Sequence, residues 1–159
     1  MNMSKKEISC PFCKPSREIQ LESPSAFAIF DRFPVSKGHM LIIPKVHVSD
    51  YFDLDAETKN SLTELLDQAK IFIDEKYSPD GYNIGINAGR AAGQTVWHVH
   101  VHLMPRYSGD TENPRGGVRG VIPDKQQYRL SSRKRSTEAE DGHGADPRTS
   151  DRGPSEPLH

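Results

Sequence analysis

Hydrophobic and polar positions alternate along the first part of the chain in ways that predict several short strands. The runs "AFAIFDRF" at 26–33 and "HMLIIPK" at 39–45 are rich in β-forming residues, and the intervening "PVSKG" is typical of a turn between antiparallel strands. "REIQLES" at 17–23 predicts a further strand before them. Two more strands are expected at 81–89 and 97–104.

A different spacing of apolar residues, three or four apart, predicts one long helix over 53–77. Its apolar stripe consists of Leu62, Leu65, Leu66, Ala69, Phe72 and Ile73. Acidic residues open the segment and Pro79 follows it, as expected of a helix start and stop. Strand, strand, helix, strand, strand with short links predicts an α+β domain, with the helix on one face of an antiparallel sheet.

The composition changes near residue 130 and divides the chain. We expect a folded domain at 8–110, a C-terminal extension of it at 111–130, and a disordered tail at 131–159. The tail has a single large aliphatic residue, Leu158, and cannot bury enough apolar surface to offset its chain entropy. The net charge is −1, with 21 basic and 22 acidic residues, so neither nucleic acid nor an anionic membrane is an expected partner.

The N-terminal residues "MNMSKKEISC" lack the apolar run of a secretory signal, and no stretch of the chain is apolar enough to span a bilayer. We therefore expect a cytoplasmic protein. In a reducing cytosol, Cys10 and Cys13 are not expected to form a structural disulfide.

Three histidines alternate in "WHVHVHLMPR" at 97–106. In a strand, alternate side chains share a face. His98, His100 and His102 should therefore form a row exposed opposite the helix, about 6–7 Å apart. The intervening Val99, Val101 and Leu103 should face the helix. Such a row suits metal binding, pH sensing, or nucleophilic attack on phosphorus.

The preceding loop "NAGRAAGQTV" at 87–96 favours attack on phosphorus. Its glycines allow backbone N–H groups to approach an anion closely, and its amide and hydroxyl side chains add donors. A glycine-rich loop alone is weak evidence, because turns also need glycine. Leading directly into a histidine row, it becomes a candidate phosphate site beside a nucleophile.

The stretch "GQTVWHVHVHLMPR" at 93–106 resembles the signature of the histidine triad (HIT) superfamily, with all three histidines and the four apolar positions in place. "FDRFPVSKGHMLIIPKVH" at 30–47 is similar to further elements of that family. The resemblance covers about residues 8–110. It implies a HIT-like antiparallel sheet with one covering helix, a homodimer joined through the sheets, and a nucleotide hydrolase or transferase acting at the α-phosphate.

The same resemblance assigns roles to individual residues. It makes His100 the nucleophile of the catalytic triad His98, His100 and His102, with His102 contacting the phosphate. It places Asp31 on the ribose hydroxyls, a task that suits a carboxylate because it accepts from two adjacent donors. Residues expected to hold phosphate oxygens are Asn87, Gly93, Gln94 and Thr95. Apolar residues expected near the base are Phe27, Ile29 and Ile43.

The motif "CPFC" at 10–13 is ambiguous between redox chemistry and zinc binding. A thioredoxin-like motif should follow a strand and open a helix, whereas this one has no strand before it. Resemblance to zinc-bearing branches of the superfamily implies a structural zinc site of Cys10, Cys13, His47 and His98. No organic cofactor is expected. His39 is either a hydrogen-bond partner of the triad or an ordinary turn histidine.

The residues after the triad, "HLMPRYSGD" at 102–110, are closer to the dinucleoside polyphosphate hydrolase branch and its bacterial relatives than to the phosphoramidase branch. The segment 113–128 departs from that pattern, and its Arg115 and Arg119 either reach a polyphosphate or are ordinary surface charges. We therefore expect cleavage of a dinucleoside polyphosphate or similar compound through a covalent nucleotidyl-histidine. Two alternatives stay open: a purine nucleoside phosphoramidase, and a slow nucleotide-binding signalling module.

Overall fold

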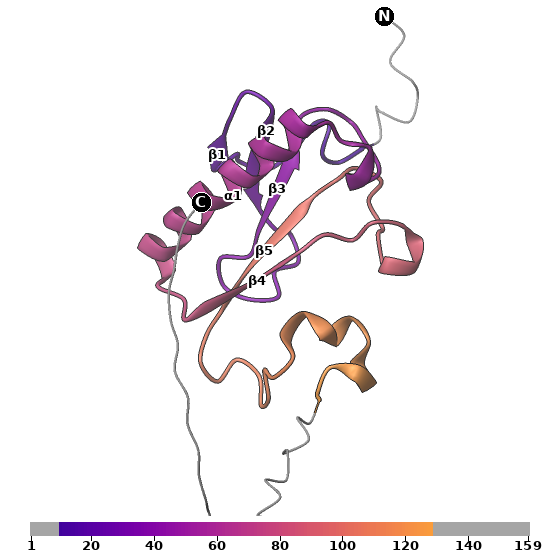
Figure 1. Ribbon diagram of the computed structural model, residues 1–159. Coiled ribbons are helices and arrows are strands. Elements are labelled where there is room, and N and C mark those ends of the chain that lie inside the picture. The colour runs from indigo at the N-terminus through magenta and orange to yellow at the C-terminus, as the bar shows by residue number, and fades with distance from the viewer. Residues whose placement is uncertain (1–9, 129–159) are drawn as a thin grey trace, which may run out of the picture. The chain divides into compact units, whose positions relative to one another are not determined.

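The computed structural model describes residues 10–128, and the predicted disordered tail at 131–159 lies outside them. Within this part of the chain, five strands form one antiparallel sheet in the order β1-β2-β3-β5-β4 (Figure 1). The strands are β1 (Leu21–Glu22), β2 (Ala26–Phe30), β3 (Met40–Pro44), β4 (Gly81–Gly85) and β5 (Val101–Arg106). With one long helix, they confirm the predicted α+β fold.

The helix α1 (Ala56–Tyr77) follows a short 3₁₀ turn, η1 (Tyr51–Asp53). Its N-cap is Asp55, whose carboxylate accepts a hydrogen bond from the backbone N–H of Thr58 at 2.7 Å. That bond satisfies a donor that the first turn would otherwise leave unpaired. Within residues 10–128, no helix is both long and apolar enough to cross a membrane.

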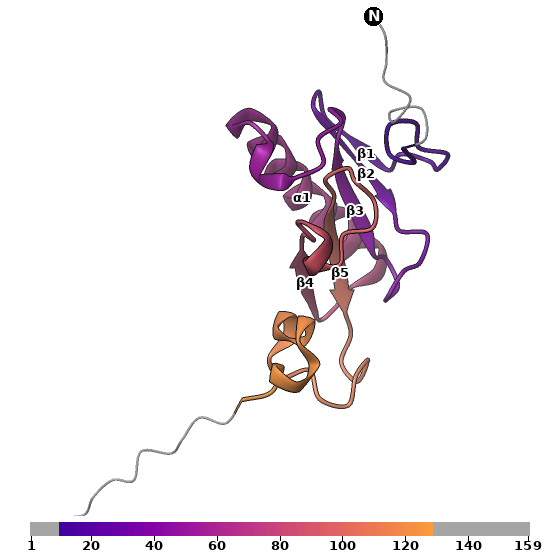
Figure 2. The same ribbon diagram turned by 90° about the vertical axis from the view of Figure 1, so that its right-hand side faces the viewer.

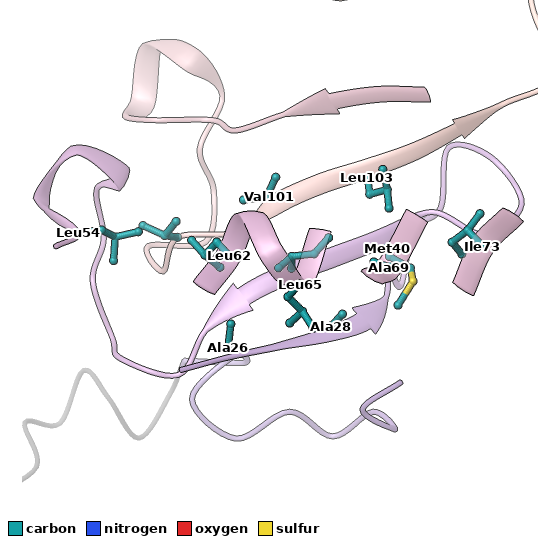
Figure 3. Close-up of a cluster of buried hydrophobic side chains, with 12 residues drawn as sticks. Ala26, Ala28, Met40, Leu54, Leu62, Leu65, Ala69, Ile73, Val101 and Leu103 are labelled. Atoms are coloured by element: carbon teal, nitrogen blue, oxygen red, sulfur yellow. The ribbon is translucent and has the colours of Figure 1, made fainter. Parts of the chain in front are cut away.

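The main hydrophobic core lies between α1 and the sheet (Figure 3). The helix contributes Leu62, Leu65, Ala69 and Ile73, which are spaced so that they share one face. Full burial of a leucine or isoleucine side chain stabilises the fold by about 1.5–3 kcal/mol. The strand residues that meet them in this core are Ala26, Ala28, Met40, Ile42, Val101 and Leu103.

The opposite face of the sheet carries a second, smaller apolar cluster. It consists of Phe27, Ile29, Leu41 and Ile43, with Phe12 packed against it. In β2 and β3 the residues of the two clusters alternate, because successive side chains of a strand point to opposite faces. Figure 2 shows the N-terminal segment, residues 10–20, on the far side of the sheet from α1. The sheet is therefore covered on both faces, by a helix on one and by an irregular segment on the other.

The strand predicted at 97–104 differs from the observed one, which begins at Val101 and extends to Arg106. Val99 and His100, the two residues before it, are not part of the strand. The backbone N–H of Val99 instead donates to the carbonyl of Val48 at 2.8 Å. Val48 lies beyond the end of β3, in a segment that the alternating pattern did not reveal. Val99, Val101 and Leu103 nevertheless lie in the helix-facing core, as predicted.

The C-terminal extension contains two 3₁₀ turns, η3 (Gly117–Val121) and η4 (Pro123–Lys125). Gly116 precedes them at φ +88°, and a Cβ there would collide with the carbonyl oxygen of Gln126. Arg119 donates to the carbonyls of Lys125 (2.9 Å) and Gln126 (3.3 Å). These contacts close the extension into a compact unit that packs on β4.

Candidate active site

The histidine row is less exposed than its alternation suggested. His98 and His100 are buried, with 0% and 8% of their surface exposed, while the His102 side chain is 21% exposed. The reason is Phe12, whose ring lies edge-on to those of His98 (5.9 Å) and His100 (5.2 Å). The expectation of an exposed row is therefore corrected: the N-terminal segment covers its first two members.

The side chain of His100 has one nitrogen available for nucleophilic attack. Its Nδ1 lies 2.8 Å from the carbonyl oxygen of His98. Because a carbonyl only accepts, Nδ1 carries the proton and the lone pair is on Nε2. His100 also lines the larger of two open clefts beside the row, here called the first cleft. The backbone carbonyl thus fixes the orientation of the ring and engages Nδ1, which leaves Nε2 as the nitrogen able to attack.

His102 belongs to a hydrogen-bonded relay that assigns its tautomer as well. The N–H of Val35 donates to His39 Nδ1 at 3.2 Å, so the proton of His39 is on Nε2. That nitrogen lies 3.0 Å from His102 Nδ1 and donates to it. The remaining proton of His102 is therefore on Nε2, where it can be donated to a ligand oxygen. His39 is thus a hydrogen-bond partner of the triad, one of the two alternatives left by the sequence.

Burial keeps both histidines of the relay neutral. It lowers the pKa of His102 to about 4, an effect to which the neighbouring His100 and His39 contribute. Burial also lowers the pKa of His39, although the Asp31 carboxylate opposes that shift. At neutral pH, His102 is accordingly a neutral donor.

Asp31, the expected ribose ligand, lies beside His39 and His102. One oxygen accepts from the N–H of Phe33 at 2.9 Å, and the other lies 3.5 Å from His39 Nε2 and 3.8 Å from His102 Nδ1. These three side chains are close enough to resemble a metal site. The proton on His39 Nε2 argues against that, because a metal-bound nitrogen needs its lone pair. The group is better described as a hydrogen-bond network.

Cys10, Cys13, His47 and His98 form a second cluster, whose ligand atoms all lie within 4.8 Å of one another. The Nδ1 of His98 is 3.4 Å from the sulfur of Cys10, 3.7 Å from that of Cys13 and 3.2 Å from His47 Nδ1. The sulfur of Cys13 is 3.2 Å from His47 Nδ1. Tetrahedral zinc with nitrogen and sulfur ligands places such atoms about 3.3–3.8 Å apart. The cluster therefore fits zinc in ligand type and spacing.

His98 is oriented for this cluster by its other nitrogen. His98 Nε2 lies 2.8 Å from the carbonyl oxygen of Pro44 and donates to it, which leaves the lone pair on Nδ1, facing the cysteines. Backbone carbonyls commonly fix metal-binding histidines in this way. Burial lowers the pKa of His98, so the imidazole is neutral and able to ligate. The sequence had placed His98 both in the triad and in the metal site, and the geometry directs its free nitrogen to the metal site.

The loop before the triad is braced by the side chain of Gln94. Its oxygen accepts from the N–H of Gly89 at 2.8 Å, and its amide nitrogen donates to the carbonyls of Ser49 (2.7 Å) and Val96 (3.2 Å). The backbone N–H groups of Gly93 and Gln94 donate to Arg90 and Gly89 around the turn η2 (Arg90–Ala92). These donors are used within the protein, so Gly93 and Gln94 shape the loop.

Two clefts share His102 in their lining. The first cleft, of about 690 Å³, is lined by residues that include Phe12, Ile29, Asp31, Leu41, Thr95 and His100. Of the three residues expected near the base, Ile29 lines this cleft, and all three belong to the apolar cluster Phe27, Ile29, Leu41 and Ile43. The second cleft, of about 590 Å³, contains Asn87 and His39 and shares Asp31, Phe33 and His102 with the first. The expected phosphate ligands Thr95 and Asn87 therefore lie in different clefts.

Sequence reasoning missed the contribution of the N-terminal segment to the first cleft. Pro11, Phe12 and Arg17 all line it. A signal was available for Phe12, because it lies between two cysteines assigned to a site with His98. Binding of those cysteines beside the row necessarily brings the intervening phenyl ring against it.

Comparison with known proteins identifies the family. The model of the HIT domain matches residues 15–109, and the chain belongs to this family. A 16.1 kDa HIT-like protein of Mycoplasma pneumoniae is 38% identical over 86 residues, 54% of this chain and 60% of that relative. The chain thus spans less than two thirds of that relative's length.

Two further relatives carry names that state an activity. The bis(5'-adenosyl)-triphosphatase of Dictyostelium discoideum is 35% identical over 65% of this chain and 69% of its own length. The adenosine 5'-monophosphoramidase hnt1 of Schizosaccharomyces pombe is 34% identical over 62% of this chain and 75% of its own length.

A solved structure shares the fold. The zinc-bound histidine triad family protein from Mycobacterium smegmatis is 34% identical, with a TM-score of 0.62 over 67% of this chain and 81% of that one. The same sheet and helix therefore occur in a relative described as binding zinc.

Proposed function

We propose that this protein is a nucleotide hydrolase or transferase in which His100 Nε2 attacks the α-phosphorus of a nucleoside phosphate derivative. The observation that carries the proposal is the bond from His100 Nδ1 to the carbonyl of His98, at 2.8 Å. It occupies Nδ1 and leaves Nε2 as the attacking nitrogen, beside a cleft large enough for a nucleotide.

In the first step, the Nε2 lone pair forms a bond to phosphorus while the bond to the leaving group breaks. The Nε2–H of His102 donates to a phosphoryl oxygen, stabilising the charge that develops there. In the second step, water attacks the same phosphorus and gives up a proton to solvent, the nitrogen–phosphorus bond breaks, and the nucleoside monophosphate departs. His100 then regains its lone pair.

The nucleoside would occupy the first cleft. Asp31 accepts hydrogen bonds from the ribose hydroxyls there, and the base packs against Ile29 and Leu41. Thr95 contributes a hydroxyl beside His100. The names of the relatives support a dinucleoside polyphosphate or a phosphoramidate as substrate.

A covalent adduct tests this mechanism. The protein is mixed with diadenosine triphosphate or with adenosine phosphoramidate, quenched within milliseconds, and digested for mass spectrometry. An adenylyl group on His100 is expected, and it should be absent from His100→Asn. Tight nucleotide binding without any adduct would instead support the slow signalling module.

We also propose that Cys10, Cys13, His47 and His98 hold a structural zinc ion. Zinc supplies no chemistry at phosphorus in this arrangement; it fastens the N-terminal segment, and with it Phe12, against the histidine row. Thiolate ligands require reduced cysteines, which supports a cytoplasmic location.

A homodimer is the expected assembly. The sheet has two edges, β1 with two residues and β4 with five. The longer edge carries the half-exposed Ile84, and pairing two β4 strands would cover the β4 edge of each chain. Light scattering at micromolar concentration should give the mass of two chains, and a monomer mass would contradict the proposal.

A further inference from the structure

The two cysteines lie where the N-terminal segment meets the histidine row. The sulfur of Cys10 is 3.4 Å from His98 Nδ1, and that of Cys13 is 3.2 Å from His47 Nδ1. The two sulfurs lie within 4.8 Å of each other. Both residues are partly exposed, so small solutes have access to them. The pair thus combines closeness with access, the two properties that thiol oxidation needs.

The first cleft takes part of its lining from the same segment. The residues concerned are Pro11, Phe12, Pro15, Ser16 and Arg17. The backbone of the segment joins the sheet further on, where the N–H of Gln20 donates to the carbonyl of Ala28 at 2.9 Å. Before that point the segment meets the sheet and the row through side chains, among them the two cysteines and Phe12. The position of this wall therefore depends on the contacts of the cysteines.

Phe12 lies between the two cysteines in the sequence and connects them to the proposed nucleophile. Its ring lies edge-on to those of His98 and His100, and it packs against the smaller apolar cluster of the sheet. Only Pro11 and Phe12 separate the cysteines, so a movement of the two sulfurs also turns the backbone of Phe12. A change at the cysteines is therefore passed directly to the surroundings of His100.

We propose that Cys10 and Cys13 are a peroxide-sensitive oxidation site, and that their disulfide releases the zinc ion and removes one wall of the first cleft. The inference rests on the proposed zinc site and nucleotide cleft. One thiolate attacks hydrogen peroxide, which gives a sulfenic acid and a hydroxide ion. The second thiolate attacks that sulfur, the sulfur–sulfur bond forms, and a second hydroxide leaves. Protons from solvent convert both hydroxides into water, so the thiolates lose two electrons and the peroxide gains them.

The disulfide no longer holds the metal, because the thiolate is the form of cysteine that binds zinc. Of the proposed ligands only His47 and His98 remain, whereas structural zinc sites use four. Loss of the ion frees Phe12 from the row, and the nucleotide loses contacts along that side of the cleft. The bond from His100 Nδ1 to the carbonyl of His98 involves neither cysteine. Oxidation therefore weakens nucleotide binding and leaves the nucleophile in place.

The test uses the full chain, loaded with zinc and then treated with an excess of hydrogen peroxide. A chromogenic chelator should detect release of about one zinc per chain, together with loss of both thiols. The Kd for adenosine monophosphate, measured by calorimetry, should rise at least about tenfold. Trypsin cleavage of the bond between Arg17 and Glu18 should also accelerate at least about tenfold, because the segment that carries this bond is no longer fastened to the row.

Two controls separate the cysteines from other targets of peroxide. Dithiothreitol with added zinc should restore the zinc content, the affinity and the resistance to trypsin. It reduces a disulfide but not a methionine sulfoxide, so this reversal excludes oxidation of Met40 or Met104 as the cause. The matched variant carries both Cys10→His and Cys13→His: imidazole also binds zinc, and no thiol is left in the chain. Its zinc content and its own Kd should not respond to peroxide.

The inference is overturned if the disulfide forms while the Kd and the cleavage rate change by less than about twofold. It is also overturned if the wild type takes up no zinc, if both thiols survive the peroxide, or if the double variant loses affinity as the wild type does. These outcomes leave the proposed function intact as long as the reduced protein forms an adduct on His100. Absence of that adduct would overturn the function, while zinc release, nucleotide binding and the cleavage rate would still decide the oxidation site.

Discussion

The two faces of the sheet are covered in different ways. One covering forms the main hydrophobic core, and the other lies beside the residues of the candidate site. On one face, a helix of 22 residues buries a continuous apolar core. On the other, an irregular N-terminal segment contributes Phe12 and two cysteines, which lie beside a smaller apolar cluster and the histidines of the row. The helix is held by many apolar contacts, whereas the irregular segment contacts the sheet through Phe12 and the two cysteines.

Strand β5 shows the same contrast within neighbouring residues. Val101 and Leu103 are almost completely buried against the helix, and His102 between them points to the clefts. The His102 imidazole is therefore attached to a strand whose other face packs in the hydrophobic core. The close packing of that core restricts the position of the strand's backbone. The contrast predicts that changes on the two faces will have separable effects, and four measurements test this.

The largest effect is expected for His100→Asn on the cleft face. It should lower turnover by at least about four orders of magnitude, since loss of the nucleophile removes the covalent route. Affinity for adenosine monophosphate should change less than about threefold, because the ribose and base contacts lie elsewhere. Steady-state rates and calorimetric titration measure the two quantities. Near-wild-type turnover would disprove the assigned nucleophile.

Leu65→Ala tests the helix face. Leu65 is fully buried, and its truncation should lower the free energy of unfolding by about 2–5 kcal/mol. Denaturant titration measures this loss, and kcat/KM well below the melting temperature should stay within about twofold. The exposed neighbour Glu64 is the control, and Glu64→Ala should cost no more than about 0.5 kcal/mol. A large loss of activity in folded Leu65→Ala would mean that the two faces are coupled.

Acid should destabilise the cleft face through its buried histidines. The pKa of His102 falls from 6.5 to about 4 on folding, by burial and by its neighbours His100 and His39, against the pull of Asp31. The unfolded chain thus binds the proton more readily. The contribution of a neutral His102 to the free energy of unfolding is fully present above pH 6.5. It is lost as the pH falls toward 4, by up to about 3 kcal/mol. The lowered pKa of His39 acts in the same direction.

The check is the free energy of unfolding measured between pH 7 and pH 4. His102→Gln keeps a hydrogen-bonding side chain but cannot take up the proton. Its stability should therefore decrease less steeply with acid than that of the wild type, by up to about 1.4 kcal/mol per pH unit. Parallel curves for the two proteins would show that His102 does not titrate in this window.

The smallest effect is expected from Cys10→Ser, on the attachment of the N-terminal segment. Protein purified without chelator or metal-affinity resin should carry about one zinc per chain, and the variant should carry less. Its melting temperature should fall by at least about 4 °C, which corresponds to about 1 kcal/mol, and its activity should fall as well. Elemental analysis and calorimetry decide the matter. A zinc-free, fully active wild type would mean that the CxxC has no structural role.

The parts of the fold that could be predicted are those set by local periodicity. The helix was expected at 53–77 and is found at Ala56–Tyr77, because apolar spacing and an acidic N-cap are both visible in the sequence. Strands β2 and β3 lie within their expected ranges. The start of β5 could not be predicted, because it depends on Val99 pairing with Val48, about fifty residues away.

The candidate site likewise has parts that could be predicted from the sequence and parts that could not. The histidine row was visible as a motif, and the proposed metal ligands followed from the CxxC motif together with the family resemblance. The geometry brings Cys10, Cys13, His47 and His98 together. The tautomers could not be read from motifs, because they depend on which carbonyl or N–H each ring meets. The burial of His100 likewise depends on how the N-terminal segment folds back across the sheet.

The bracing of the loop by Gln94 has a consequence for substrate capture. Three hydrogen bonds tie its amide to Gly89, Ser49 and Val96, so the loop is held in shape without a ligand. Ordering a loose loop on binding costs conformational entropy that subtracts from affinity. A loop ordered in advance avoids that cost, and it favours capture of the substrate by a preformed shape over induced fit.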